Sequence, residues 1–424
     1  MANEDFLSLL KDEMKPALGV TEPGAIALAC ASAYKAIGGE LKEIELVLDE
    51  GIFKNAYSCA IPGTDDLGNE MSAILGVIAG KPELELEVLK YIDEEDIKAA
   101  EKLRDSNIVK IKVLRDLKGI HIDSKVETDL GWGRAVIEGK HSNIVLVETN
   151  KKVIFKKQYK TNDKNAEGSF NIKEYKLSDL INFVDNVPKE DIEFTLEAIK
   201  VNEELAKSGM NGAGMNAALG LSKLLTDEVI SEDVILHGQM LTGYAIDARV
   251  GGVAKEAMSI SGSGSHGIIA TMPLLAVAKK YNIDDDKLSR AIALSFLITI
   301  YIKEYSGRLS AFCGCAIAAG TGASVGIVYM LGGSIEQITY TINNMAANIT
   351  GMICDGGNYG CSLKAITATN AAMMSAFFAL KDISIPNNFG IVGQTPEETM
   401  INMGKIASPG MLETENTILD IMMK

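Results

Sequence analysis

The sequence predicts an α+β fold, in which a mostly helical domain carries an inserted, mainly antiparallel α+β domain. Between residues 41 and 187, apolar and polar residues alternate with a period of two, as in EIELVLDE, NIVKIKVL and NIVLVETNKKVIFKKQY. Such alternation is typical of half-buried strands. From residue 188 to 424 the chain has long apolar stretches, rich in small residues and punctuated by glycine, which indicate buried helices.

The first 40 residues are similarly rich in small residues. FLSLLKDEM predicts an amphipathic helix, and PGAIALACASAYKAI predicts a second helix that begins near Pro23. We therefore expect residues 1–40 and 188–424 to form one discontinuous helical domain. Residues 41–187 would then be the inserted α+β domain, with the charged helix DEEDIKAAEKL on its surface.

Composition excludes several classes of function. The chain has 424 residues, of which 47% are hydrophobic, and a net charge of −16. A field of this sign repels phosphate backbones and anionic lipids, so we expect no nucleic-acid partner. The N-terminus, MANEDFLSLLKDEMK, has no apolar signal region, which predicts a cytoplasmic location.

One uncharged stretch, residues 309–335, is long enough to span a bilayer. It is rich in Gly, Ala, Ser and Thr rather than in Leu and Phe. We therefore expect a helix buried in a tight helical core and no membrane association.

Six cysteines are spread unevenly over this long chain, which argues against a disulfide scaffold. They are Cys30, Cys59, Cys313, Cys315, Cys354 and Cys361. The gaps of 41 residues between Cys313 and Cys354 and of seven between Cys354 and Cys361 match neither a zinc motif nor a ferredoxin motif. A glycine-rich turn between the last two could bring them toward one cluster, or both could be small buried side chains. Cys30 and Cys59 are expected elsewhere.

A glycine–serine loop, SISGSGSHGI, precedes an apolar helix. Its backbone amides could converge at the helix N-terminus and bind a carboxylate or phosphate, although a tight turn between helices has the same pattern. The candidate anion-binding residues are Ser261, Gly262, Ser263, Gly264 and Ser265. His266 would place a titratable group beside them.

Two further segments carry polar candidates. Thr21 and Glu22 stand at a helix start, where Thr21 could serve as a cap or both could bind a ligand. Arg249 could hold a substrate carboxylate, or it could pair with Asp247 instead.

Taken in order, the motifs LGVTEPGAIALA, DARVGG, SISGSGSHGIIATMP, RLSAFCGCAIAAG and GMICDGGNYGCSLK resemble those of the L-cysteine desulfidase family, a relative of the α chain of iron–sulfur L-serine dehydratases. The resemblance runs from about Lys15 to the C-terminus. It implies a homodimeric lyase with an oxygen-sensitive 4Fe–4S cluster, held by three cysteines with one iron open. By this resemblance Cys313, Cys354 and Cys361 are the candidate ligands, and the glycine–serine loop receives the carboxylate of a small amino acid.

The implied reaction is β-elimination from L-cysteine, which yields 2-aminoacrylate and then pyruvate and ammonia. L-Serine is the alternative substrate. One departure bears on this, because Val20 stands where the family motif has a cysteine. If that cysteine is a ligand, Cys315 or Cys361 must take its place. If it is catalytic, this chain has changed substrate or is an inactive, cluster-free member that only binds a small carboxylate.

Overall fold

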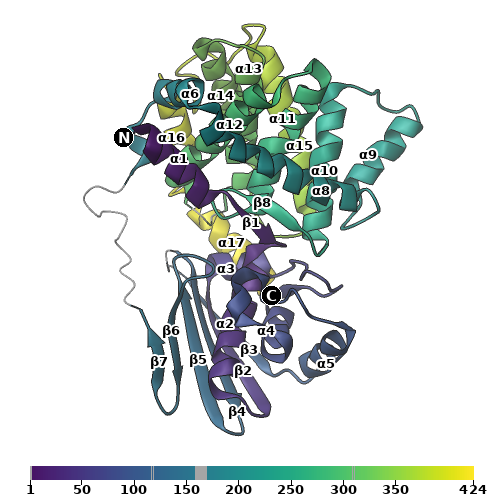
Figure 1. Cartoon of the computed structure of the whole chain (residues 1–424), viewed down its shortest axis with the longest axis vertical. Helices are drawn as coiled ribbons and strands as arrows, with labels where there is room; N and C mark the ends of the chain where they lie inside the picture. Colours follow the sequence, from purple (N-terminus) through teal and green to yellow (C-terminus); the bar gives the residue numbers. More distant parts are fainter. Residues whose placement is uncertain (1, 116, 118, 158–169, 308, 310) are drawn as a thin grey trace.

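The chain folds into two lobes, one helical and one built on a sheet (Figure 1). The computed structural model describes residues 2–115, 117, 119–157, 170–307, 309 and 311–424.

The helical lobe contains most of the chain after residue 170. Its helices are α1 (Ala2–Glu13), η3 (Ile172–Glu174), α6 (Leu177–Asn186), α7 (Lys189–Ile192), η4 (Glu193–Leu196), α8 (Glu197–Gly209), α9 (Ala217–Thr226), α10 (Val234–Val250), α11 (Gly264–Tyr281), α12 (Asp285–Ser306), the π-helix η5 (Cys315–Ala319), α13 (Gly320–Met330), α14 (Ile335–Ile349), α15 (Gly360–Ala379) and α16 (Pro396–Ala407). Strands β1 (Lys15–Leu18) and β8 (Glu256–Ser259) pair antiparallel on its lower side.

The second lobe is a six-stranded sheet covered by helices. Its strands are β2 (Leu41–Asp49), β3 (Val109–Leu114), β4 (His121–Thr128), β5 (Gly131–Glu138), β6 (Ile144–Thr149) and β7 (Val153–Lys156). The spatial order is β3-β2-β4-β5-β6-β7, with only β2 and β3 parallel. The helices are α2 (Thr21–Ile37), α3 (Glu50–Ala56), α4 (Gly68–Ala79), η1 (Pro82–Glu87), α5 (Glu94–Arg104) and α17 (Leu412–Met422).

The predicted α+β fold with a mainly antiparallel sheet is therefore confirmed. The alternation of apolar and polar residues reflects half-buried strands, as expected, since every second residue of β4 is buried. Helix α5 lies on the surface with one buried residue, Ala100, as its charged sequence predicted. Residues 158–169, which include the end of the predicted strand segment, lie outside the described residues.

Helix α2 packs differently from our expectation. We placed it with the helical domain, but its buried residues belong to the core beneath the sheet. Its alanines allow a close approach to β5, where a Cβ placed on Gly133 would lie 2.1 Å from the carbonyl oxygen of Ala33. The small-residue texture at this point therefore serves helix–sheet packing.

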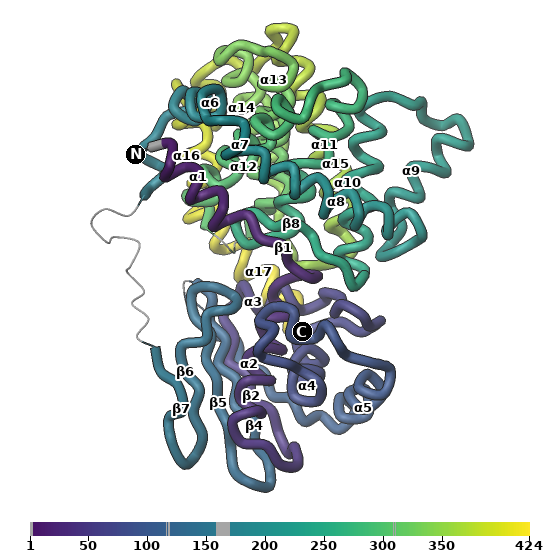
Figure 2. The backbone as a smooth tube through the Cα atoms, viewed as in Figure 1, coloured from purple at the N-terminus to yellow at the C-terminus, as the bar shows by residue number. Residues whose placement is uncertain are grey.

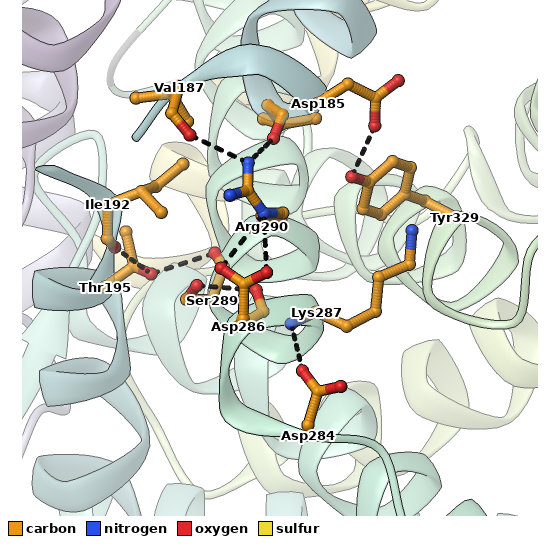
Figure 3. A network of polar contacts seen from close by, with 11 residues as sticks. Asp185, Val187, Ile192, Thr195, Asp284, Asp286, Lys287, Ser289, Arg290 and Tyr329 are labelled. Atoms are coloured by element: carbon orange, nitrogen blue, oxygen red, sulfur yellow. Dashed lines mark hydrogen bonds and ion pairs between the residues drawn. The ribbon is translucent and has the colours of Figure 1, made fainter. Parts of the chain in front are cut away.

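Residues 170–187 also differ from the predicted division, because they pack into the helical core. Figure 3 shows the polar contacts that hold the end of this segment. Arg290 of α12 donates from Nη1 to the carbonyl oxygen of Val187 at 3.0 Å, and Tyr329 donates to Asp185 at 2.7 Å. The division into two domains, one of residues 1–40 and 188–424 and the other of residues 41–187, thus stays a proposal. These contacts would assign residues 170–187 to the helical domain.

Residues 315–330 of the uncharged stretch form η5 and α13, whose residues are almost all buried in the helical core. Glycines permit this packing, because a Cβ placed on Gly322 would lie 2.3 Å from the carbonyl oxygen of Ser295. Among the described residues, no helix combines the length and apolarity that crossing a bilayer requires.

The C-terminal helix α17 returns to the sheet lobe, where the chain ends (Figure 2). Its Leu419 is fully buried in the core of that lobe. Glu415 pairs with Lys54 of α3 at 2.6 Å, and both side chains are buried. This pair anchors α17 to the first helix after β2.

Candidate functional site

A small cavity of about 70 Å³ lies where the two lobes meet. Four of the six cysteines line it, namely Cys313, Cys315, Cys354 and Cys361. The start of α2 and helix α3 contribute from the sheet lobe, and α10, α11 and α15 contribute from the helical lobe.

Local backbone pairing brings the distant cysteines together. The amide of Cys313 donates to the carbonyl of Met352 at 3.0 Å, and the amide of Cys354 donates to the carbonyl of Ala311 at 2.6 Å. This short antiparallel bridge joins two segments 41 residues apart in sequence. Cys361 then begins the first turn of α15, after the glycine-rich turn.

The turn between Cys354 and Cys361 is held from both sides. Asp355 forms an ion pair with Lys364, which also lines the cavity. On the other side, the amide of Gly357 donates to the carbonyl of Asn55 at 3.0 Å. The turn is therefore braced by α15 and by α3 of the sheet lobe.

The thiols share a poorly solvated environment. Burial raises the pKa of Cys313, and the nearby Cys315, Cys354 and Cys361 raise it further. Burial likewise raises the pKa of Cys315 to about 12, and it raises that of Cys361. These groups stay neutral thiols unless a bound cation stabilises their thiolates. Within the described part of the chain, no three His, Cys, Asp or Glu side chains are arranged as ligands of a single metal ion.

Arg249, in the last turn of α10, is buried and lines the cavity. Its Nη1 donates to Ser265 Oγ at 2.9 Å. The alternative partner, Asp247, instead accepts a hydrogen bond from the Ala218 amide at 3.0 Å. Gly264 allows the guanidinium to lie against the loop, because a Cβ there would be 2.6 Å from Arg249 Nε.

The glycine–serine loop does precede a helix, and α11 begins at Gly264. Ser261 and Gly262 have positive φ values of 50° and 77°, which form the tight turn. Ser263 and Ser265 line the cavity, whereas Ser261, Gly262 and Gly264 do not. Ser263 Oγ lies 3.8 Å from Cys315 Sγ.

His266 is buried in the first turn of α11 and does not itself line the cavity. Its Nδ1 lies 3.1 Å from the carbonyl oxygen of Ile260. Since a carbonyl only accepts, Nδ1 carries the proton and Nε2 is unprotonated. Burial, together with the positive charge of Lys303, lowers the pKa of His266 to about 3, so the ring is neutral at physiological pH.

Glu22 is a buried carboxylate at the cavity wall. Burial opposes its ionisation, but the neighbouring His141 imidazole and a hydrogen bond from Asn55 lower its pKa to about 2. Asn55 Nδ2 donates to Oε1 at 2.9 Å, and His141 Nε2 lies 3.7 Å from the same oxygen. Thr21 does not cap α2; its hydroxyl donates to Glu22 Oε2 at 3.1 Å, and it does not line the cavity.

Sequence reasoning did not find Asn55, His141 or Lys364 as site residues. Asn55 lies in α3, His141 in the β5–β6 connection, and Lys364 in α15. No motif marks the first two, because only tertiary packing within the sheet lobe brings them to Glu22. Lys364 lies three residues after Cys361, close to one turn of helix, and that spacing could have indicated it.

The two remaining cysteines differ from one another. Cys30 lies away from the cavity, where it accepts a hydrogen bond from Ser124 at 3.2 Å. The expectation that Cys59 also lies elsewhere is wrong. A Cβ placed on Gly357 would be 3.2 Å from Cys59 Sγ and 3.3 Å from Val20 Cγ1. Cys59 therefore lies directly behind the cavity wall, beside Val20, which lines it.

Comparison with known proteins identifies the family of the chain. A family model described as "Serine dehydratase alpha chain" matches residues 83–420. A "UPF0597 protein" of Clostridium botulinum is 51% identical over 424 residues, covering 99% of this chain and 98% of that one. Proteins of the same name from Clostridium tetani and Caldanaerobacter subterraneus are 39% and 38% identical, covering 99% and 98% of this chain and 98% and 97% of their own lengths. The chain therefore belongs to the serine dehydratase alpha-chain family.

Proposed function

We propose that this protein is an iron–sulfur-dependent lyase that eliminates sulfide from L-cysteine, giving pyruvate and ammonia. The observation that carries the proposal is the convergence of four cysteines, a buried arginine and a buried carboxylate on one cavity. Thiols suit iron, and the two opposite charges suit the two ends of a zwitterionic amino acid.

The donor set fits a 4Fe–4S cluster held by Cys313, Cys354 and Cys361. Cys354 and Cys361 lie close enough to Cys313 to raise its pKa, yet the three thiols are not arranged around a single ion. In a cluster each thiolate binds a different iron, so the ligand sulfurs stand farther apart than around one metal ion. When bound, the cluster would supply an open iron as a Lewis acid toward the departing sulfur or oxygen.

The chain's own residues would bind and orient the substrate. Arg249, supported by Ser265, presents guanidinium N–H groups to the carboxylate, and the first amides of α11 add their partial positive charge. Glu22, ionised across the physiological pH range, would hold the ammonium group. Burial of the cavity keeps bulk water away from both charges, which strengthens their attraction for the substrate.

His266 is our candidate for the group that moves the Cα proton. Its neutral ring has an unprotonated Nε2, which a base requires. A Cβ placed on Gly314 would lie 2.8 Å from this atom, so only a glycine, next to Cys313 and Cys315, separates it from the cysteine segment. Loss of the Cα proton and of the sulfide leaves 2-aminoacrylate, whose imine form hydrolyses to pyruvate and ammonia.

L-Serine dehydratase activity is the second candidate, favoured by the family to which the chain belongs. A third reading is a cluster-free member that binds a small carboxylate. Val20 favours it, since this side chain lines the cavity and can neither bind iron nor transfer a proton. A homodimer and a cytoplasmic location are also part of the proposal, and the homodimer follows from the resemblance alone.

The test is an anaerobic purification followed by two measurements on the same sample. Iron and acid-labile sulfide per chain report the cluster, and pyruvate formation from L-cysteine and L-serine gives kcat/KM for each. We expect about four irons per chain, as a 4Fe–4S cluster contains, and a higher kcat/KM for L-cysteine. Absence of iron would favour the carboxylate-binding alternative, and a higher kcat/KM for L-serine would favour the dehydratase.

Matched cysteine variants sharpen the test. Cys354→Ser should lose iron and pyruvate formation together. Cys30→Ser removes a buried thiol that lies outside the cavity, so it should keep both. Equal iron in the two variants would remove Cys354 from the proposed ligand set.

A further inference from the structure

Two buried polar atoms of cavity residues have no hydrogen-bond partner within the part of the chain that the structure describes. One is Arg249 Nε, a donor, and the other is Asn55 Oδ1, an acceptor. Buried polar groups are nearly always satisfied, so an unmatched donor and an unmatched acceptor on two residues that line the same cavity point to a ligand that supplies the missing partners. The donor matches a carboxylate, and the acceptor matches an N–H group.

Chemistry fixes the orientation of the Asn55 amide. The Glu22 carboxylate is ionised and can only accept hydrogen bonds, so the amide must turn its Nδ2 toward Glu22 Oε1, as the 2.9 Å contact shows. The opposite end of the amide is therefore an oxygen. Glu22 and Asn55 thus bring acceptor oxygens to the cavity lining, while Arg249 and Ser265 bring donors.

We infer that Asn55 is a substrate-binding residue whose Oδ1, together with the Glu22 carboxylate, receives the ammonium N–H groups of an α-amino acid. The site then selects amino acids with a free α-ammonium group over the corresponding α-hydroxy acids, whose single hydroxyl hydrogen cannot serve two acceptors. This inference rests on the proposed use of the cavity for a small carboxylate, but not on the reaction that follows.

The side chain and the backbone of Asn55 have separate roles, so recognition of the ammonium group can be tested without disturbing the structure. Its backbone carbonyl accepts from the Gly357 amide and thereby braces the turn that carries Cys354 and Cys361. A side-chain substitution keeps that backbone contact. A change at Asn55 should therefore alter recognition of the ammonium group while leaving the cysteine turn in place.

The experiment measures equilibrium binding of L-alanine and L-lactate to the full-length, anaerobically purified protein by calorimetry. Neither compound has a β leaving group, and they differ only in ammonium against hydroxyl. We expect the unmodified protein to bind L-alanine more tightly. Asn55→Ala should weaken the binding of L-alanine by about tenfold or more, as expected for the loss of a hydrogen bond to a charged group. The affinity for L-lactate should stay unchanged.

Asn69→Ala is the matched control. Asn69 is a buried asparagine of the same lobe, and its amide donates to the carbonyl of Phe53 rather than facing the cavity. This variant should keep the ratio of L-alanine to L-lactate affinity. If Asn55→Ala does not fold, Asn55→Ser carries the same test, because its shorter side chain does not reach both Glu22 and the substrate.

The outcomes separate this inference from the proposed function. Equal losses for both ligands in Asn55→Ala, or no loss for either, would overturn the role of Asn55. An unmodified protein that does not distinguish L-alanine from L-lactate would overturn it even if L-cysteine is cleaved. Selective loss of L-alanine binding supports the inference even if the protein releases no sulfide, in which case only the proposed reaction fails.

Discussion

Gly356, in the turn between Cys354 and Cys361, offers the sharpest test of how the site is built. Its φ is +95°, and a Cβ placed there would lie 2.3 Å from the carbonyl oxygen of Lys54. Alanine in the left-handed region costs about 1–2 kcal/mol. The clash with backbone adds about 1–3 kcal/mol, as for other overpacked positions. Because Lys54 is fixed in α3, we expect the cysteine turn to move rather than the helix.

Gly332 supplies the matched control for Gly356→Ala. It has a φ of +78°, and a Cβ there would meet no atom within 4 Å. Gly332→Ala should therefore lower the free energy of unfolding only by the cost of placing alanine at a positive φ. We would measure guanidinium unfolding by circular dichroism and iron per chain after anaerobic reconstitution. Gly356→Ala should lose more stability and most of its iron. Equal stability and equal iron in the two variants would refute the close approach as the feature that positions the turn.

Three further predictions follow from the cavity. Val20→Cys should raise kcat for sulfide release without changing iron per chain, since the three proposed cysteine ligands already suffice. An increase in iron per chain would instead indicate that the new thiol is a ligand. Strong activity of the unmodified protein, with no gain in the variant, would show that a cysteine at position 20 is dispensable. Gly264→Val should raise KM at least tenfold, because a Cβ there would lie 2.6 Å from Arg249 Nε, and unchanged kinetics in an active enzyme would count against the loop as the carboxylate site. Glu22 has a pKa of about 2 in the folded chain against an ordinary 4.5, so its ionisation stabilises the fold above pH 4.5, by about 3 kcal/mol, and this contribution disappears as the pH falls toward 2. The difference in unfolding free energy between the unmodified protein and Glu22→Gln should accordingly shrink from pH 7 to pH 3, and a constant difference would contradict the assignment.

Much of this architecture could be predicted because periodicity reports burial directly. The alternation in 43–49, 144–149 and 153–156 became strands, and residues 315–330 of the apolar stretch became a buried helical segment. The division between lobes was harder to predict. An alanine-rich helix packs equally well on helices or on a sheet, and the sequence of α2 does not distinguish the two.

Some residues of the site could likewise be predicted from the sequence, and others could not. Arg249, Ser263 and Cys354 lie in motifs, could be identified from the sequence and line the cavity, whereas other motif residues, such as Ser261 and His266, do not line it. Asn55 and His141 could not, since each reaches Glu22 through tertiary contacts across about 30 and 120 residues of sequence. Cys59 was misplaced for a related reason. Its local sequence says nothing about Gly357, whose missing side chain lets the thiol approach the cysteine turn.

The geometry at Lys54 connects the last helix of the chain to the chemistry of the cavity. Its side chain pairs with Glu415 of α17, while its carbonyl lies against Gly356 and the next residue, Asn55, contacts both Glu22 and Gly357. Helix α3 is therefore held on one side by the C-terminal helix and supports the cysteine turn on the other. A buried ion pair is costly to break, so this anchoring resists displacement of α3. The sheet lobe thus does more than cover the cavity, because it positions Glu22 and Asn55 relative to the cysteine turn.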